Sequence, residues 1–188
     1  MTAAATEQAT GQGTGQATGQ EKRYLGKYRG IVASNIDPLG LGRLLVQVPD
    51  VLADDPCFWA MPALPGASIQ AGLFALPPIN AKVWVEFEQG NPDYAVWVGC
   101  FPGSTADLPA LAAAMPAAAS PIVLQTTGQH TVALSDLPGA AGGVLLKSTS
   151  GAFVSVSSTG VVLSNGRGAI VSLAAGLVTV NGGALIVK

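Results

Sequence analysis

Residues 152–188 read AFVSVSSTGVVLSNGRGAIVSLAAGLVTVNGGALIVK, and this stretch decides the fold. Glycine recurs about every eight residues along the C-terminal part of the chain, at Gly143, Gly151, Gly160, Gly168, Gly176 and Gly183. The segments between the glycines are rich in β-branched residues, and each is long enough for one short strand. Such a repeat indicates a stacked β architecture, in which each unit buries its apolar side against its neighbours.

The C-terminal part of the chain, past residue 104, contains few charged residues. Past residue 104 the charged residues are Asp107, Asp136, Lys147, Arg167 and Lys188. One sheet built from these strands would expose an apolar face and open edges, which favours aggregation. We therefore expect three copies to wrap together as an intertwined triangular prism, each chain lending a strand to each layer, with glycines turning the chain onto the next face. A single-chain solenoid or an ordinary sandwich is the alternative, although a solenoid coil usually needs about twenty residues per turn.

The bulk composition excludes several classes of protein. Of the 188 residues, 49% are hydrophobic and 11% are charged, with a formal net charge of -2. No apolar run approaches the roughly 18 residues of a membrane span, and the first residues lack the basic start and apolar core of a secretory signal. We expect synthesis in the cytoplasm without a signal peptide. The negative net charge argues against binding of nucleic acid, which requires a basic surface.

Composition divides the chain into four parts. Residues 1–22 consist mainly of Gly, Thr, Gln and Ala and contain no aromatic residue, which predicts a flexible low-complexity arm. Residues 23–103 contain alternating, strand-like stretches separated by turn signals, which predicts a small β-barrel or sandwich. Residues 104–121 are rich in Ala and Pro and predict a linker with one helical turn near 111–115. Residues 122–188 form the predicted trimeric spike.

The strand-like stretches of the second part are YRGIVAS, GRLLVQVPD, AKVWVEFEQG and YAVWVGCF. The third stretch alternates in a way that assigns its two faces. Val83, Val85 and Phe87 share the face that should fill the barrel. On the other face lie Trp84, Glu86 and Glu88, a polar and aromatic surface for solvent or for a partner.

Four blocks of this sequence resemble the central spike of contractile injection systems, the family of phage baseplate assembly protein V and VgrG-like spikes. They are GKYRGIVASN, GRLLVQVPD, LPPINAKVWVEFEQGNPDYAVWVGCF and SNGRGAIVSLAAGLVTVNGGALIVK. The resemblance covers residues 24–188 and implies an OB-fold barrel that leads into a trimeric triple-stranded β-helix. Asn80 stands where the family pattern has Gly, and Asn also tolerates the left-handed backbone that this turn implies.

The resemblance also implies partners. The barrel would dock on a hub protein of the tail tube, through an outer surface for which Trp84, Glu86 and Glu88 are candidates. The spike would carry a PAAR-like tip protein on its apolar end, formed by Ala184, Leu185, Ile186, Val187 and Lys188. Other baseplate components would surround the homotrimer in an assembled injection particle, inside the cell or released from it. A target membrane would be contacted only transiently, during puncture.

No enzymatic motif accompanies this architecture. Glu86 and Glu88 are a close acidic pair, but no further acid or histidine joins them, so a solvated strand face is the preferred interpretation over a glycosidase pair. GxSxG and phosphate-loop arrangements are absent from the sequence. We therefore expect no catalysis and no cofactor.

His130 is the single histidine of the chain. Three copies could converge near a trimer axis and bind an ion, so His130 is a weak candidate for a metal site, although a hydrogen-bonded structural role is the main expectation. Two other functions remain as alternatives: an OB-fold nucleic-acid-binding protein and a trimeric cell-surface adhesin. A basic groove with stacking aromatics would favour the first, and a signal peptide or anchor would favour the second.

Overall fold

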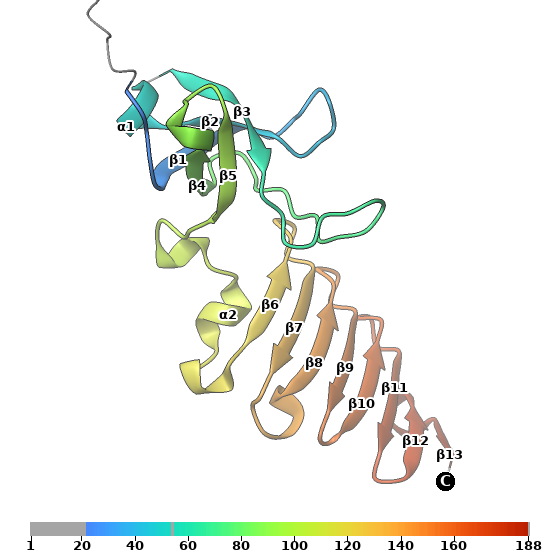
Figure 1. The fold of residues 1–188 in the computed structure, drawn as a ribbon. Helices are drawn as coiled ribbons and strands as arrows, with labels where there is room; N and C mark the ends of the chain where they lie inside the picture. The colour runs from blue at the N-terminus through green and yellow to red at the C-terminus, as the bar shows by residue number, and fades with distance from the viewer. Residues whose placement is uncertain (1–21, 54, 188) are drawn as a thin grey trace, which may run out of the picture.

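The computed structural model describes residues 22–53 and 55–187. Apart from Lys22, the arm expected over residues 1–22 lies outside the described residues, as does Lys188 of the expected tip surface. The described chain forms a closed five-stranded barrel, a linker and an eight-stranded sheet, in that order (Figure 1). This confirms an all-β fold with a small barrel before a β-rich C-terminal half. None of the described helices is long and apolar enough to cross a membrane.

The barrel has the strand order of an OB-fold. Its elements are β1 (Tyr28–Ser34), β2 (Leu44–Gln47), α1 (Pro49–Leu52), β3 (Pro56–Pro62), β4 (Lys82–Phe87) and β5 (Ala95–Cys100). The strands follow one another around the barrel as β1-β2-β3-β5-β4, and β4 pairs with β1 to close it. The β3–β5 pair is parallel and the other pairs are antiparallel. Closure leaves the barrel without a free sheet edge.

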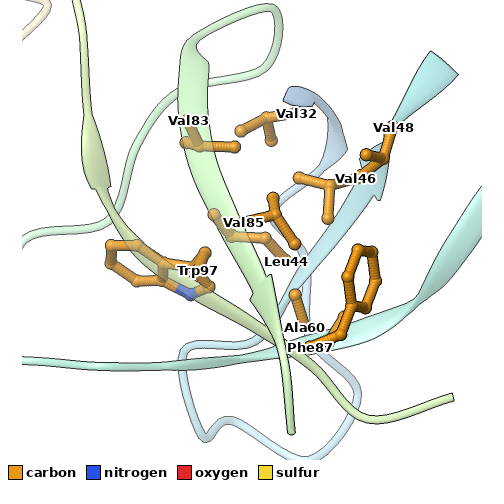
Figure 2. Packing of buried hydrophobic residues seen from close by; sticks show 10 residues of the cluster. Val32, Leu44, Val46, Val48, Ala60, Val83, Val85, Phe87 and Trp97 are labelled. Carbon is orange, nitrogen blue, oxygen red and sulfur yellow. The ribbon is translucent and has the colours of Figure 1, made fainter. Parts of the chain in front are cut away.

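Alternating residues of the strands fill the barrel. Val83, Val85 and Phe87 of β4 are buried, as their spacing predicts. They pack in one cluster (Figure 2) with Val48, which directly follows β2, and with residues of the other strands, namely Val32, Leu44, Val46, Ala60, Ala95 and Trp97. The buried Trp97 indole donates a hydrogen bond of 3.2 Å from Nε1 to the carbonyl oxygen of Gly42. The one polar group of this large side chain is therefore satisfied inside the core.

Two features of the barrel differ from the sequence-based expectation. The alternation pattern does not predict β3, because prolines at both of its ends, Pro56 and Pro62, look like turn signals. In addition, β4 ends at Phe87, so Glu88 does not continue the outer face of Trp84 and Glu86. It begins the 3-10 turn η1 (Glu88–Gly90), where Gln89 takes a left-handed backbone with φ 53°. At Asn80 the expected left-handed conformation is present, with φ 69°.

A single carboxylate organises the β1–β2 connection, residues 35–43. Asp37 accepts hydrogen bonds from the backbone N–H groups of Leu39 (3.0 Å), Leu41 (2.8 Å) and Arg43 (3.2 Å). The Arg43 guanidinium also donates to it, with Nη2 2.6 Å from Oδ1. The hydrogen bonds from the Arg43 side chain and the backbone hold the pKa of the Asp37 carboxyl well below its usual range. The loop is thereby fixed in one conformation.

The linker contains short helical turns separated by prolines. They are η2 (Thr105–Asp107), α2 (Ala110–Ala114) and η3 (Ala117–Ala119). The helical turn expected near 111–115 is therefore present as α2. Pro109 precedes α2 and Pro116 precedes η3, because proline interrupts a continuous helix at each of these points.

The C-terminal sheet is a meander of eight antiparallel strands. They are β6 (Ile122–Gln125), β7 (Thr131–Ser135), β8 (Gly143–Lys147), β9 (Phe153–Ser157), β10 (Gly160–Ser164), β11 (Ile170–Ala174), β12 (Leu177–Val180) and β13 (Leu185–Val187), with the 3-10 turns η4 (Gly139–Ala141) and η5 (Asn181–Gly183). Each strand pairs with the next one along the chain. The expected alternation of short strands and glycine turns is present. The glycines differ from expectation in one respect, because they turn the chain back into the same sheet and not onto another face.

The glycine repeat has a steric cause at two equivalent positions. Gly143 and Gly160 start β8 and β10, and their φ angles are 88° and 143°. A β-carbon at Gly143 would overlap the carbonyl oxygen of Val156, and one at Gly160 would overlap that of Leu173. The close approach of the neighbouring strand therefore adds to the backbone requirement for glycine.

We predict that Gly160→Ala destabilises the sheet more than Gly176→Ala. Both positions have positive φ, but a β-carbon at Gly176 meets no atom within 4 Å. The extra overlap at Gly160 should cost about 1–3 kcal/mol in the free energy of unfolding beyond the loss at Gly176. Denaturant titration followed by circular dichroism measures both variants. Equal losses would contradict the steric explanation.

We predict a pH-dependent effect of Asp37→Asn. Because the folded-state pKa of Asp37 is lowered, the stability from its ionised form is fully present above the unfolded pKa of about 3.9 and declines as the pH falls below it. The urea midpoint of the variant should therefore lie below that of the wild type at neutral pH, with a smaller difference near pH 2.5. Asp93→Asn, at an exposed site, is the control. A difference independent of pH would argue against the role of this carboxylate.

Candidate trimer interface

The strand register places one kind of side chain on one face of the sheet. Residues directly opposite each other on neighbouring strands share a face. Following the register from β6 to β13 gives an apolar face of sixteen residues, all Leu, Ile or Val: Ile122, Leu124, Val132, Leu134, Val144, Leu146, Val154, Val156, Val161, Leu163, Val171, Leu173, Val178, Val180, Leu185 and Val187. We call this set the apolar face.

The apolar face is uncovered in a single chain. None of its sixteen residues is buried, and those with the largest exposure range from 37% for Val132 to 59% for Ile122. Soluble monomers rarely leave so extended an apolar surface in water. Completing the burial of sixteen such side chains is worth on the order of 10 kcal/mol per chain before the entropy of association is subtracted. The sheet therefore requires a partner surface along its whole length.

The opposite face is of mixed composition and is partly covered by the chain itself. Its central row contains Val123, Ala133, Leu145, Ser155, Val162, Ser172 and Thr179. Thr131 and Ala133 of β7 are buried, and so is Ala119 of the linker, whose carbonyl oxygen accepts a hydrogen bond of 3.0 Å from the Asp136 N–H. The linker therefore packs on this side of the first strands. The apolar face receives no such cover.

Charge plays little part at this surface. Within the eight strands the charged residue is Lys147, and its register with Thr131 and Phe153 places it on the mixed face. Association through the apolar face therefore depends on the removal of apolar area from water. Such association is insensitive to screening by salt, unlike an interface built on ion pairs.

Family models match both halves of the chain. Residues 28–101 match a model described as the type VI secretion system/phage-baseplate injector OB domain. Residues 121–186 match a model described as the phage baseplate V C-terminal trimerisation domain.

The chain belongs to the phage baseplate V family. The family assignment confirms the expected structural role in a baseplate and the expected trimerisation through the C-terminal half. It also makes the chain part of an assembled phage or injection particle. A search of curated proteins found no match. The second model names trimerisation for the residues that carry the apolar face, so three copies of the sheet supply each other's missing cover.

The baseplate V barrel carries the outer residues expected to face a hub. Trp84 is half-buried, because its ring lies 4.6 Å from that of Phe101 between centroids and the Arg29 guanidinium lies 5.6 Å from its centroid. Glu86 forms an ion pair with Lys27. Glu88 is separate from both, exposed in η1 at the start of the β4–β5 connection. The structure therefore brings Trp84 and Glu86 onto one strand face and places Glu88 beyond its end.

His130 lies in the turn between β6 and β7, and its side chain is exposed. Its backbone N–H donates to Thr126 Oγ1 at 3.2 Å, and its carbonyl oxygen accepts from the Thr126 N–H at 3.0 Å. The described part of one chain contains no group of three or more His, Cys, Asp or Glu side chains that could hold a metal ion. A metal site at His130 would thus need the same residue from three chains, and it stays a weak candidate.

We predict that Leu173→Asp prevents trimer formation while Ser172→Asp does not. The two residues are neighbours on β11, but their register places Leu173 on the apolar face and Ser172 on the mixed face. Three buried aspartates near one axis would each need desolvation without a partner. Sedimentation velocity should show a monomer for the first variant and a trimer for the second. A trimer of unchanged stability for Leu173→Asp would place the interface elsewhere.

Proposed function

We propose that this chain is the central spike of a contractile injection system, which docks on a hub through its barrel and carries a PAAR-like tip on its sheet. The observation that carries the proposal is the uncovered apolar face of sixteen residues in a chain of the baseplate V family. Three such sheets, with their apolar faces directed inward, form a triangular prism. With eight strands about 4.8 Å apart, the prism is roughly 35 Å long.

The positions of the barrel and the sheet support the assignment of the hub to one end of the chain and of the tip to the other. The barrel and the sheet lie at opposite ends of the described chain, and α1 lies on the side of the barrel away from the sheet (Figure 1). β5 leads from the η1 turn toward the linker, so Glu88 belongs to the barrel end that is distant from the sheet. A hub that docks on this end would contact Glu88 first and could extend along β4 to Glu86 and Trp84.

The far end of the sheet offers a different surface. In the described residues, β13 is the last strand of the sheet and pairs with β12 on one side only. Leu185 and Val187 are 58% and 53% exposed. An edge strand with apolar side chains needs protection from non-specific pairing. A PAAR-like tip seated on residues 184–188 would supply it and would give the spike a point.

The mechanical role follows from the kind of interface. Separation of three sheets exposes the whole apolar face of each at once, so dissociation has a large barrier and the prism is kinetically stable. A prism held in this way transmits axial load from the hub to the tip. Contact with a target membrane is then limited to the moment of puncture.

We predict that Ala184→Asp abolishes binding of the tip and leaves the trimer intact. Ala184 is exposed, belongs to the expected tip surface and lies outside the sixteen-residue apolar face, so the added charge does not enter the trimer interface. Co-purification with a PAAR-family protein from the same genome should fail for this variant and succeed for Ser158→Asp, which changes an exposed turn residue. Tip binding by both variants would exclude this end as the tip site.

The function as a whole is tested in the particle. Electron microscopy of particles assembled without this chain should show baseplates that lack a central spike, and the wild-type chain supplied in trans should restore it. A complete spike in its absence would refute the proposal.

A further inference from the structure

Two loops at one end of the barrel expose large apolar side chains. They are the β1–β2 connection, residues 35–43, and the β3–β4 connection, residues 63–81. Their exposed apolar residues are Ile36, Leu39, Leu41, Ile69, Leu73, Phe74 and Ile79, and we call this set the barrel ledge. Ile69 is 93% exposed and Phe74 is 63% exposed, the highest values of the β3–β4 connection. The barrel core alone does not explain why these residues are apolar.

The ledge has a fixed conformation. Asp37 holds the β1–β2 connection through hydrogen bonds to its backbone. The Phe74 ring lies against Gly42, with Cε2 2.8 Å from the position that a β-carbon would occupy there, so the two loops touch. Near the tip of the β3–β4 connection, the Ser68 N–H donates to the Ala71 carbonyl oxygen at 2.8 Å. An ordered loop with an apolar tip loses little entropy when it binds a partner.

The ledge is continuous with the apolar face of the sheet. One open hollow of about 1100 Å³ is lined by Leu73, Phe74 and Leu76 of the β3–β4 connection and by Leu124, Val132 and Leu146 of the apolar face. Polar residues at the strand ends and turns, among them His130 and Lys147, complete its rim. Figure 1 shows this connection extending from the barrel toward the barrel-side ends of the strands. The ledge and the first strands thus form two walls of one hollow, and the apolar residues of the two walls face a shared space.

The chemistry of the ledge matches that of the sheet. Residues 63–81 contain no charged side chain, in a barrel that holds most of the charged residues of the chain. A docking site for an unrelated soluble protein usually has a polar rim. The charged residues of the β1–β2 connection, Asp37 and Arg43, are paired with each other. An apolar surface that continues an interface between copies fits more of the same interface, because exposed apolar side chains are unfavourable in water.

We propose that the trimer interface extends beyond the trimerisation domain onto the barrel. In the trimer, the β3–β4 connection of one chain packs against the barrel-side ends of β6–β9 of a second copy. The matched trimerisation region begins at residue 121, so this contact couples the barrel of one chain to the sheet of the next. It would hold the three barrels against the prism by a direct contact in addition to the linker.

The contact is tested by photo-crosslinking of the full-length chain. Benzoylphenylalanine at position 69 should give covalent dimers and trimers, and mass spectrometry should map the link to residues 122–156 of another chain. Position 25 is the matched control, because Leu25 is 73% exposed and lies outside the ledge. Crosslinks only within one chain, or none, at position 69 overturn the proposal.

A substitution gives a second, independent readout. Because Ile69 is 93% exposed, Ile69→Ser removes almost no contact within its own chain. The exchange of subunits between labelled and unlabelled trimers should speed up by about tenfold or more, while the trimer mass is retained. Leu25→Ser should exchange at the wild-type rate. Equal rates for the two variants overturn this extension alone, whereas a monomeric wild type would overturn it together with the trimer.

Discussion

The architecture of this chain depends on one constraint, the need to cover sixteen Leu, Ile and Val side chains that share a single face of a sheet. In the described chain none of these sixteen residues is buried. The linker is joined to the end of β7 by the hydrogen bond from the Asp136 N–H to the Ala119 carbonyl oxygen, and the buried Ala133 lies on the mixed face. Cover must therefore come from identical copies, and the match to a trimerisation domain identifies them as three. The scarcity of charge in the tail follows from the same requirement.

The barrel solves the opposite problem. Five strands close on themselves around Val83, Val85 and their neighbours, so the barrel has a complete core and no free edge. Its surface remains available for contacts with other molecules, which is where Glu86 and Glu88 lie. One chain thus combines a barrel with a complete core of its own and a sheet whose apolar face needs cover from other copies.

Much of this could be read from the sequence, because alternation and glycine spacing are local signals. The period of the glycines predicted the short strands, the alternation in β4 predicted the buried Val83, Val85 and Phe87, and the family resemblance carried the OB-fold. Features that depend on contacts distant in sequence were missed. The strand β3 is flanked by prolines and is held by its pairing with β2 and β5. The end of β4 before Glu88 depends on the turn at Gln89, and the barrel ledge depends on the contact between Phe74 and Gly42.

The most direct test of the account is the mass of the purified full-length chain in solution, measured by light scattering over a range of concentrations. The account predicts a single species of three times 18.8 kDa, about 56 kDa, that persists on dilution and at high salt. A monodisperse species of 18.8 kDa would mean that a single chain tolerates the exposed apolar face, and it would contradict the trimer on which the spike depends.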